Sequence, residues 1–405
     1  MNMEHEMARL AASLNIPDFR FPVIQIHPGS LACVSDVLSR NHWSQAVLVY
    51  DRNTFPAAGK SLMEVLQSHG FQVTGIQLQD NEHGEVIADE QSVVQVLAET
   101  PNDADVLVAV GTGTIHDIVR FVSHKMNIPF VSVPTAASVD GFVSKGAPLI
   151  LRGVKRTIQT AAPAAVFADL LVLQAAPREL TAAGFGDMLG KVTSLLDWEI
   201  SSLIGNEPYS ELAASITKQA LDQCLNHVES IGRAEAKGIK ILMQALIASG
   251  LVMQVLDHSR PASGAEHHLS HYWEMKLLER NQRQLLHGAK VAAAAAIITD
   301  LYKQRWNQVL NAAKRQQFSY AKAIETYGPV IQSRINQLPS SDQIRRWAEL
   351  AGGPSTIEQL GLSEELVTES LNEAFRLRDR CTGLFLINQT KDGEIRYSDI
   401  RPKRE

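Results

Sequence analysis

The chain has 405 residues, 45% of them hydrophobic and 20% charged, which is the composition of a globular protein long enough for two domains. Its formal net charge of −6 leaves no basic surface of the kind that binds nucleic acid, so DNA and RNA are excluded as expected partners. Only three cysteines occur, Cys33, Cys224 and Cys381, without the paired spacing of a cysteine zinc site, and this indicates a reducing compartment.

No targeting segment is recognisable in the sequence. The first residues, M-N-M-E-H-E-M-A-R-L, are too polar and acidic for a signal peptide. The longest apolar run, residues 291–298, is too short to cross a bilayer. We therefore expect a cytoplasmic protein with no membrane span.

The N-terminal part of the chain alternates strands with helices. Apolar runs that end at turn residues predict strands, and apolar residues three or four apart predict helices. The predicted strands are residues 21–26, 46–50, 72–78, 106–110, 129–133 and 165–173, and the helices between them include 57–69 and 90–99. Ser30 is expected to cap the helix after the first strand. This alternation is typical of a parallel sheet covered by helices on both faces.

Two changes of pattern follow along the chain. Residues 135–180 break into short apolar pieces separated by glycine and proline, which predicts an additional small sheet or hairpin. After Pro177 the chain consists of long helix-periodic segments, at residues 190–203, 210–230, 236–256 and 286–302. The sequence therefore predicts a Rossmann-like α/β domain with a parallel sheet over residues 1–180 and an all-α domain over residues 181–405.

A candidate nucleotide-binding turn lies at the end of the fourth predicted strand. Residues 106–117, V-L-V-A-V-G-T-G-T-I-H-D, predict a buried strand, a Gly-Thr-Gly turn and the start of a helix. Such a junction presents free backbone N–H groups and the positive end of a helix dipole, and its glycines let a pyrophosphate approach closely. His116 stands where the dinucleotide fingerprint has its third glycine, so the motif is not the standard one, and an ordinary tight turn is the alternative.

Histidines gather in one segment of the C-terminal half. Residues 263–266, S-G-A-E, have the form of a capping box that begins a helix at Gly264. Helical spacing then puts His267 and His271 on one face, whereas His268 points about 100° away and is expected at the surface.

Two further groups complete a candidate metal site. His287 lies just before Gly288 at the start of an alanine-rich helix, and Asp187 follows the turn G-F-G. Imidazoles and one carboxylate from separate helices suit zinc, nickel or iron, and three protein ligands leave a position open for substrate. A solvated or hydrogen-bonded helix face is the alternative for the histidines.

Five motifs follow one another along the chain. They are G-T-G-T-I-H-D at 111–117, P-T-A-A-S-V-D-G-F-V-S at 134–144, G-F-G-D at 184–187, S-G-A-E-H-H-L-S-H at 263–271 and L-H-G-A-K at 286–290. In this order they resemble the dehydroquinate synthase-like superfamily, which includes metal-dependent polyol dehydrogenases, and within it the bacterial branch of the glycerol-1-phosphate dehydrogenase family. The resemblance extends from about Phe21 to Cys381. It implies a Rossmann-like domain, a helical domain and an active site in the cleft between them.

The resemblance also implies roles for single residues. One divalent ion, nickel or zinc, would be bound by Asp187, His267 and His287. The substrate would contact Asp140, Asp187 and His271, with Asp187 and His271 as the catalytic residues. NAD(H), and NADP(H) to a lesser degree, would bind through Gly111, Thr112, Gly113, Thr114, Ile115, Thr135, Ala136, Ala137, Ser138 and Ser144. Many relatives have a glycine in place of Thr112, which leaves the pyrophosphate hydrogen bonds open. Relatives of this kind also suggest a homodimer.

Asp51, at the end of the strand predicted over residues 46–50, is a further candidate for the coenzyme site. An acidic side chain at this place accepts hydrogen bonds from the adenosine ribose and repels a 2′-phosphate. NADH is therefore expected to be preferred, and the neighbouring Arg52 is expected to allow some binding of NADPH. The alternative for Asp51 is the cap of a turn or helix.

The activity that the resemblance implies is the reversible reduction of dihydroxyacetone phosphate to sn-glycerol 1-phosphate. A divalent ion polarises the carbonyl, and the nicotinamide delivers hydride. His271 would hydrogen-bond the substrate or pass a proton, unless it only orients its neighbours. Lys145, Lys155 and Arg156 are candidates for the phosphate, with solvated surface charge as the alternative.

Three other functions stay open at this point. They are a glycerol dehydrogenase acting on the unphosphorylated polyol, a dehydroquinate synthase, which would have a glutamate in place of Asp187, and a catalytically silent dinucleotide-binding protein.

Overall fold

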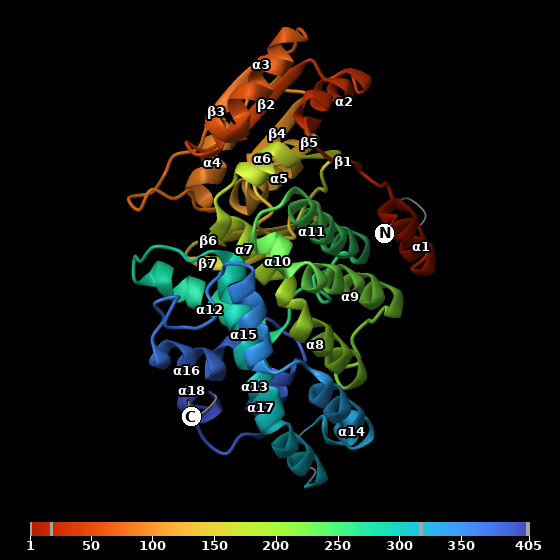
Figure 1. Cartoon of the computed structure of the whole chain (residues 1–405), viewed down its shortest axis with the longest axis vertical. Helices are drawn as coiled ribbons and strands as arrows, with labels where there is room; N and C mark the ends of the chain where they lie inside the picture. Colours follow the sequence, from red (N-terminus) through yellow and green to blue (C-terminus); the bar gives the residue numbers. More distant parts are fainter. Residues whose placement is uncertain (1, 17–18, 316–318, 402–405) are drawn as a thin grey trace. The chain divides into compact units, whose positions relative to one another are not determined.

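The computed structural model describes residues 2–16, 19–315 and 319–401, and the chain divides into two compact units. The first unit comprises Met1–Gly184 and Asn226–His258, and the second comprises Phe185–Leu225 and Ser259–Glu405. Figure 1 labels their elements along the chain. The domain boundary predicted after residue 180 remains an expectation, but by packing the segment Asn226–His258 belongs with the first unit.

The first unit contains all the strands of the described chain. The strands are β1 (Val23–His27), β2 (Gln45–Tyr50), β3 (Gln72–Gln77), β4 (Val106–Gly111), β5 (Phe130–Pro134), β6 (Gly146–Leu151), β7 (Val154–Gln159) and β8 (Ala165–Asp169). The helices are α1 (Met3–Ser13), α2 (Val34–Arg40), α3 (Lys60–Ser68), α4 (Glu90–Glu99), α5 (Gly113–Met126), α6 (Leu170–Ala175), α10 (Val228–Gly232) and α11 (Ala236–Leu256), with the short turns η1 (Ser30–Cys33) and η2 (Phe55–Gly59). The helix α7 (Arg178–Leu189) begins in this unit.

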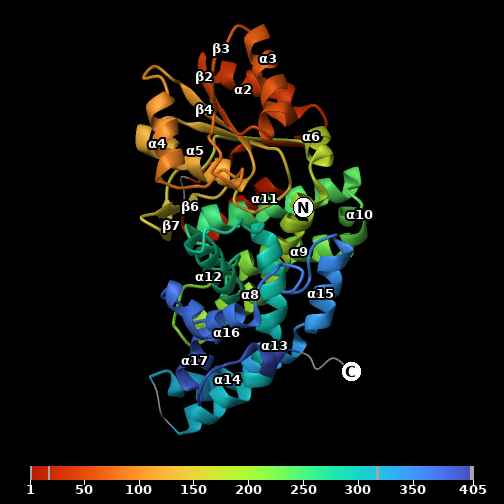
Figure 2. The same cartoon turned by 90° about the vertical axis from the view of Figure 1, so that its left-hand side faces the viewer.

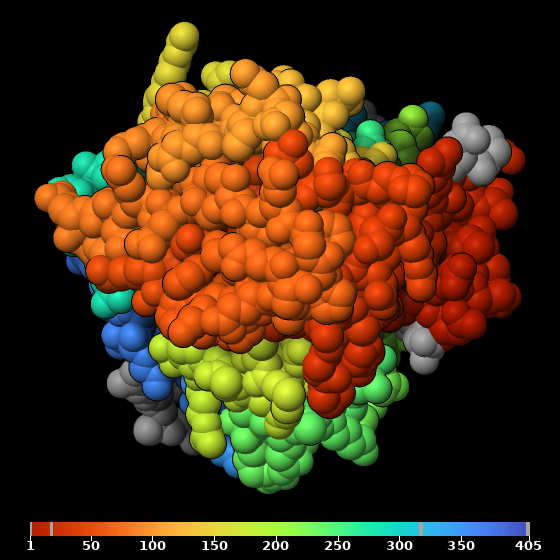
Figure 3. Space-filling model, turned by 90° about the horizontal axis from the view of Figure 1, so that it is seen from above, coloured from red at the N-terminus to blue at the C-terminus, as the bar shows by residue number. Residues whose placement is uncertain are grey.

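Six strands form one parallel sheet in the order β1-β8-β5-β4-β2-β3. The six predicted strands and their parallel arrangement are therefore confirmed. β3 is an edge strand with exposed side chains, in the part of the chain from β2 to α4 that appears in orange in Figure 3. β6 and β7 form the separate hairpin expected within residues 135–180, and its turn residues Arg152 and Gly153 both have positive φ, as a tight hairpin turn requires.

Alternate residues of the central strands face two different cores, because successive side chains of a strand point to opposite faces. Val106, Val108 and Val110 pack with residues of α2 and α3. Leu107 and Ala109 pack with residues of α4 and α5. Figure 2 shows these two pairs of helices on opposite sides of the sheet. Both faces are covered, which explains why β4 is apolar throughout.

The contacts of Asp169, at the end of β8, differ from two predictions. The strand predicted over residues 165–173 ends at Asp169, because this carboxylate caps α6 by accepting the N–H of Leu171 at 3.0 Å. The same carboxylate accepts the N–H groups of Gly29 at 3.0 Å and Leu31 at 3.2 Å. The prediction that Ser30 caps this turn is therefore wrong, and the Ser30 hydroxyl is buried without a hydrogen bond to the described residues.

α11 is the central apolar helix of the first unit, where it packs against α1, α6 and β1. It is long and apolar enough to cross a membrane, but 72% of its most apolar window is buried inside the structure. A helix that is apolar on all sides and buried is typical of a protein core. Uninterrupted apolar runs do not reveal this helix in the sequence, because polar residues such as Gln244 interrupt it.

The second unit is helical throughout its described residues, which confirms the predicted all-α C-terminal part. Besides the end of α7 it contains α8 (Lys191–Leu203), α9 (Glu211–Asn226), α12 (Ala265–Glu279), α13 (His287–Lys314), α14 (Ala321–Gln337), α15 (Ser341–Leu350), α16 (Glu364–Glu373), η3 (Ala374–Leu377), α17 (Gly383–Thr390) and α18 (Tyr397–Ile400). The long helix α13 contacts α8, α12, α14, α15, α17 and α18, and it forms the axis of this unit in Figure 1.

Two predicted helices have different lengths in the structure. The helix predicted over residues 210–230 is broken at His227, which separates α9 from α10. The helix predicted over residues 286–302 continues to Lys314.

Candidate metal and coenzyme sites

Two helices of the second unit, α7 and α13, approach each other closely at glycines. A Cβ atom on Gly186 would lie 2.2 Å from the carbonyl oxygen of Gly288, a separation that no side chain tolerates. Asp187 follows Gly186, and His287 precedes Gly288. The glycine contact therefore places these two predicted ligands at the same point.

The predicted metal ligands come together in the structure. One ligand atom from each of Asp187, His267 and His287 lies within 4.8 Å of the others. Two ligand atoms of a tetrahedral zinc ion, each about 2.1 Å from it, are about 3.4 Å apart, so the widest pair of this set would have to close by up to about 1.4 Å around an ion. The ring of His271 lies 6.1 Å from that of His267 and 5.8 Å from that of His287, centroid to centroid. The predicted common face of His267 and His271 is thus confirmed.

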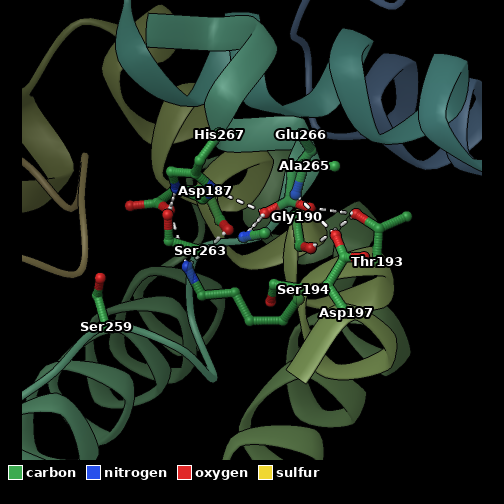
Figure 4. A network of polar contacts seen from close by, with 12 residues as sticks. Asp187, Gly190, Thr193, Ser194, Asp197, Ser259, Ser263, Ala265, Glu266 and His267 are labelled. Atoms are coloured by element: carbon green, nitrogen blue, oxygen red, sulfur yellow. Dashed lines mark hydrogen bonds and ion pairs between the residues drawn. The ribbon is translucent and has the colours of Figure 1, made fainter. Parts of the chain in front are cut away.

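Glu266 orients the His267 ring. Its Oε1 accepts the Nδ1–H of His267 at 2.7 Å, which leaves Nε2 of that ring directed towards Asp187, 3.7 Å from Oδ1 (Figure 4). Oε1 also accepts the N–H of Gly264 at 2.6 Å, and Oε2 accepts the Thr193 hydroxyl at 2.7 Å. A carboxylate behind a metal-binding histidine fixes its tautomer and raises its basicity.

The start of α12 differs from the predicted capping box by one residue. Gly264, not Ser263, is the N-cap, and no side chain of the cap residue bonds the first turn. Glu266 still reaches back to a backbone N–H, as in a capping box. The N–H of Ala265 is bound by Asp197 of α8 at 2.7 Å, so a residue far away in the sequence replaces the serine cap.

Lys191 is a member of the site that the sequence argument missed. Its Nζ lies 2.8 Å from Asp187 Oδ1, and both side chains are buried. Burial alone would raise the pKa of the Asp187 carboxyl, but the Lys191 ammonium and the imidazoles of His267 and His287 outweigh it and hold this pKa below its usual value. The carboxylate is therefore ionised, as a metal ligand must be. The four-residue spacing from Asp187 to Lys191 was the available sequence signal.

A second buried carboxylate, Asp197, lies behind Glu266. It accepts hydrogen bonds from Tyr302 Oη at 2.7 Å and from the N–H of Gly383 at 2.8 Å, in addition to Ala265. Burial and the neighbouring Glu266 raise the pKa of Asp197 to about 6. Through these bonds α8, α12, α13 and α17 are connected beneath the metal ligands.

His268 is not at the surface, and that prediction is wrong. Its side chain is fully buried, because α12 packs against α8, α13, α16 and η3. Neither ring nitrogen has a hydrogen bond to the described residues, and burial holds the pKa of His268 well below its usual value.

In the first unit, the predicted coenzyme residues meet at the carboxyl edge of the sheet. The pairing of Val49 with Ala109, and of Gly111 with Pro134, brings the ends of β2, β4 and β5 to one level. The strand order reverses between β2 and β4, the place where open α/β sheets bind ligands. The N–H of Thr135 donates to the Gly111 carbonyl at 3.0 Å. The Gly-Thr-Gly turn and the loop after β5 are therefore adjacent.

The start of α5 suits an anion. Thr112 is its N-cap and makes no side-chain capping bond. A Cβ atom on Gly113 would lie only 3.0 Å from a methyl group of Val139, which explains the second glycine of the turn. His116, in place of a third glycine, is buried, with Nδ1 2.8 Å from the Thr112 carbonyl and Nε2 2.8 Å from Ser132 Oγ. Burial lowers the pKa of His116 to about 3, so it is a neutral link between α5 and β5.

Arg120 was also missed by the sequence argument. Its buried guanidinium donates to the carbonyl groups of Gly141 and Gly146, the latter at 2.7 Å, and to Ser144 Oγ at 3.3 Å. It thereby holds the loop that carries Asp140 and Ser144. A second contact to this loop comes from α11, where Ser249 donates to Asp140 Oδ2 at 2.8 Å.

Comparisons with known proteins identify the family. A family model described as iron-containing alcohol dehydrogenase matches residues 25–177. Glycerol-1-phosphate dehydrogenase (NAD(P)+) from Bacillus licheniformis is 51% identical over 347 residues, which cover 86% of this chain and 83% of that protein. The protein of the same name from Bacillus subtilis (strain 168) is 48% identical over 357 residues, 88% of each chain. The chain belongs to the glycerol-1-phosphate dehydrogenase family.

As a member of this glycerol-1-phosphate dehydrogenase family it is an oxidoreductase, and the resemblance seen in the five motifs is confirmed. Among solved structures it is similar to a probable glycerol dehydrogenase from Sinorhizobium meliloti 1021, with a TM-score of 0.66, 18% identity and coverage of 92% of this chain and 96% of that one. Glycerol dehydrogenase from Schizosaccharomyces pombe gives a TM-score of 0.65 at 18% identity, covering 94% and 88%. These two similarities show the fold alone.

The other predicted site residues of this family member, namely Asp51, Arg52 and the candidates for the phosphate, differ in how many of their polar groups are already bound. Asp51 Oδ1 accepts the N–H groups of Asn53 and Thr54, both at 2.8 Å, so the turn-cap alternative holds for one oxygen, while Oδ2 has no hydrogen bond to the described residues. Arg52 pairs with Asp80 at 3.1 Å. Among the candidates for the phosphate, Lys145 pairs with Asp257 at 3.3 Å, and the other two lie on β7.

Proposed function

We propose that this chain catalyses the reversible reduction of dihydroxyacetone phosphate to sn-glycerol 1-phosphate, with NADH as the preferred coenzyme and NADPH as the weaker one. The observation that supports this most strongly is the group formed by Asp187, His267 and His287, in a chain 51% identical to a protein named glycerol-1-phosphate dehydrogenase. Nickel or zinc is the expected ion, because one carboxylate and two imidazoles suit these metals.

Asp187, His267 and His287 would hold the metal, which when bound acts as a Lewis acid that polarises the substrate carbonyl. The residues around them prepare the ligands. Lys191 keeps Asp187 ionised, and Glu266 keeps the proton of His267 on Nδ1. In the second unit the substrate would contact Asp187 and His271. His271 would donate a hydrogen bond to the developing alkoxide or transfer a proton to it.

The coenzyme would bind at the carboxyl edge of the sheet in the first unit. The N–H groups at the start of α5, from Gly111 to Ile115, would bind the pyrophosphate, and Thr135 to Ser138 with Ser144 would line the nicotinamide side. Asp51 Oδ2 would accept from the ribose. Asp140, held by Ser249, would bind a substrate hydroxyl.

An NADH-oxidation assay with dihydroxyacetone phosphate and dihydroxyacetone, with and without added nickel or zinc, tests this proposal. We expect kcat/KM at least about a hundredfold higher for the phosphorylated ketone, because charge-assisted contacts to a phosphate are worth roughly 3 kcal/mol. A chelator should abolish both activities. Equal efficiency on the two ketones, or a product consumed by an enzyme specific for sn-glycerol 3-phosphate, would make glycerol dehydrogenase the better assignment.

The expectation of a cytoplasmic homodimer rests on the resemblance and on the three cysteines, all of which are unpaired. Light scattering of the purified protein tests the expected homodimer, and cell fractionation tests the expected cytoplasmic location.

A further inference from the structure

Two arginines of the second unit, Arg378 and Arg380, lie close together without a carboxylate partner. Arg378 Nη1 donates weakly to the hydroxyls of Ser259 at 3.4 Å and Ser263 at 3.3 Å. Arg380 Nη1 donates to the Ser263 carbonyl. Arg378 is extended, with φ −144° and ψ 142°, so Asp379 between the two points the other way and is exposed. Within the described residues, neither guanidinium has an acidic group within 4.0 Å.

Other enclosed arginines of this chain do have such a partner. Arg120 pairs with Asp117 at 3.0 Å, and Arg260 pairs with Glu207 at 2.5 Å. A charge removed from water is costly unless an opposite charge and hydrogen bonds compensate it. Arg378 and Arg380 have no such contact, although Glu266 acts on both of them and Asp197 and Glu207 act on Arg380 from farther away. An anion from outside the chain would supply the missing contact.

Burial and hydrogen bonding show how strong this requirement is. Burial, reinforced by the neighbouring Arg380, lowers the pKa of Arg378 to about 10. Nε and Nη2 of Arg380 are buried without a hydrogen bond to the described residues, as are both ring nitrogens of His268. Arg378 itself is partly exposed, and its Nε and Nη2 make no hydrogen bond to the described residues. One edge of its guanidinium is thus open to a ligand.

This group of residues, Arg378, Arg380, His268, Ser259 and Ser263, is called the arginine cluster below, and it adjoins the metal ligands. Ser263 precedes the N-cap of α12, and His268 follows His267 directly. Glu266, which binds His267, raises the pKa of Arg378, so the two charges act on each other. Ser263 appears near Asp187 in Figure 4, whereas Ser259 stands apart from the network at the lower left.

We propose that the arginine cluster binds the phosphate group of the substrate, with the open edge of Arg378 and the hydroxyls of Ser259 and Ser263 as its direct contacts. A guanidinium presents two parallel N–H groups that match two phosphate oxygens, and a dianion would compensate both arginines. Arg380 positions Ser263 through its carbonyl. This inference rests on the proposed function, and it places the phosphate on residues other than Lys145, Lys155 and Arg156.

Arg378→Gln tests the proposal in the metal-loaded enzyme. We expect kcat/KM for dihydroxyacetone phosphate to fall at least about thirtyfold, which corresponds to about 2 kcal/mol, while the value for dihydroxyacetone stays within about twofold. Arg376→Gln is the matched control, because Arg376 is exposed and its contacts are with Glu373 and the ring of Phe375, and it should change neither value. Metal analysis should find the same ion content in all three proteins.

Inorganic phosphate gives a second measurement that does not depend on turnover. Calorimetric titration should show phosphate binding to the wild type, weakened at least about tenfold in Arg378→Gln. If that variant does not fold, Ser259 and Ser263 can both be changed to Ala. We expect the double variant to bind phosphate about three- to tenfold more weakly and to show a kcat/KM for dihydroxyacetone phosphate lower by the same factor, while kcat/KM for dihydroxyacetone is unchanged.

The outcomes separate the two proposals. A wild type that does not reduce dihydroxyacetone phosphate refutes the proposed function, and phosphate titration then still decides whether the cluster binds an anion. If the wild type does reduce it, two results overturn the inference. One is an equal loss of kcat/KM for both ketones in Arg378→Gln, and the other is phosphate binding by this variant that is as tight as in the wild type.

Discussion

Replacement of Glu266 by Gln should weaken metal binding while the fold stays intact. All three groups around this carboxylate donate to it, but not to the same oxygen. Oε1 accepts from Gly264 and His267, and Oε2 accepts from Thr193. A glutamine can keep its oxygen in the place of Oε1 and direct its amide group at the Thr193 hydroxyl, which turns to accept. The substitution therefore removes the charge and keeps the number of hydrogen bonds.

The expected magnitude follows from that difference. A hydrogen bond to a charged group is worth roughly 1.5–3 kcal/mol and a neutral one about 0.5–1.5 kcal/mol, so the bond to His267 weakens by about 1.4 kcal/mol, which is a factor of about ten. This agrees with the tenfold to hundredfold losses known for residues that support metal ligands. Glu266→Ala removes all three bonds, and we expect it to lose about a hundredfold in affinity and also to be less stable.

Competition with a chromophoric chelator measures the metal affinity, and thermal unfolding of the same samples measures stability. Thr193→Val is the control, because it removes the bond to Oε2 and a contact with the Gly190 carbonyl but leaves both donors to Oε1 in place, and its metal affinity should stay within about threefold of the wild type. Metal affinity unchanged in Glu266→Gln would refute the view that this carboxylate prepares His267 for a metal.

Three further predictions concern single residues. His287→Ala should lose its metal and its turnover but remain folded, which metal analysis and circular dichroism check; a variant that retains both metal and full activity would contradict the ligand assignment. Asp51→Ala should raise the kcat/KM of NADPH relative to NADH, and an unchanged ratio would remove Asp51 from the coenzyme site. Because the pKa of Asp197 is raised from 3.8 to about 6, the folded protein keeps a proton on this group that the unfolded chain has released, so the contribution of Asp197 to the free energy of unfolding should decline as the pH rises from about 4 to 6. Urea titrations across this range should show that the decline is absent in Asp197→Asn.

Local patterns predicted the elements whose causes are local. The strands β2 and β4 contain continuous apolar runs, and β5 is apolar except for Ser132. The common face of His267 and His271 follows from helical pitch alone. Asp187, His267 and His287 were predicted as metal ligands because each lies beside a glycine or a helix start and because the five motifs resemble those of a known family. The structure shows the reason at Gly186, where the glycine permits the contact with α13.

The errors occurred where a distant residue decides the local structure. Asp169 binds the N–H groups of Gly29 and Leu31 on either side of Ser30, whose hydroxyl caps no N–H group of the described residues, and Asp197 binds the N–H of Ala265 near Ser263. The burial of His268 depends on α8, α13, α16 and η3, which come from distant parts of the chain and pack around α12. Arg378 had no local signal at all, because the serines that it contacts are more than 100 residues away.

The order in which the first unit becomes complete has a consequence for synthesis. Its sheet is finished at β8, but α11, which covers α1, α6 and β1 and holds Asp140 through Ser249, lies after a segment of the second unit. A fragment that stops at Gly184 would therefore expose the apolar surface that α11 buries and would leave the Asp140 loop without one of its supports. On the ribosome, this unit has to wait for 87 more residues before its core can close, since α11 ends at Leu256 and the last strand ends at Asp169. Excised coenzyme-binding fragments of this chain should accordingly need Asn226–His258, supplied in the same chain or as a separate peptide, to fold.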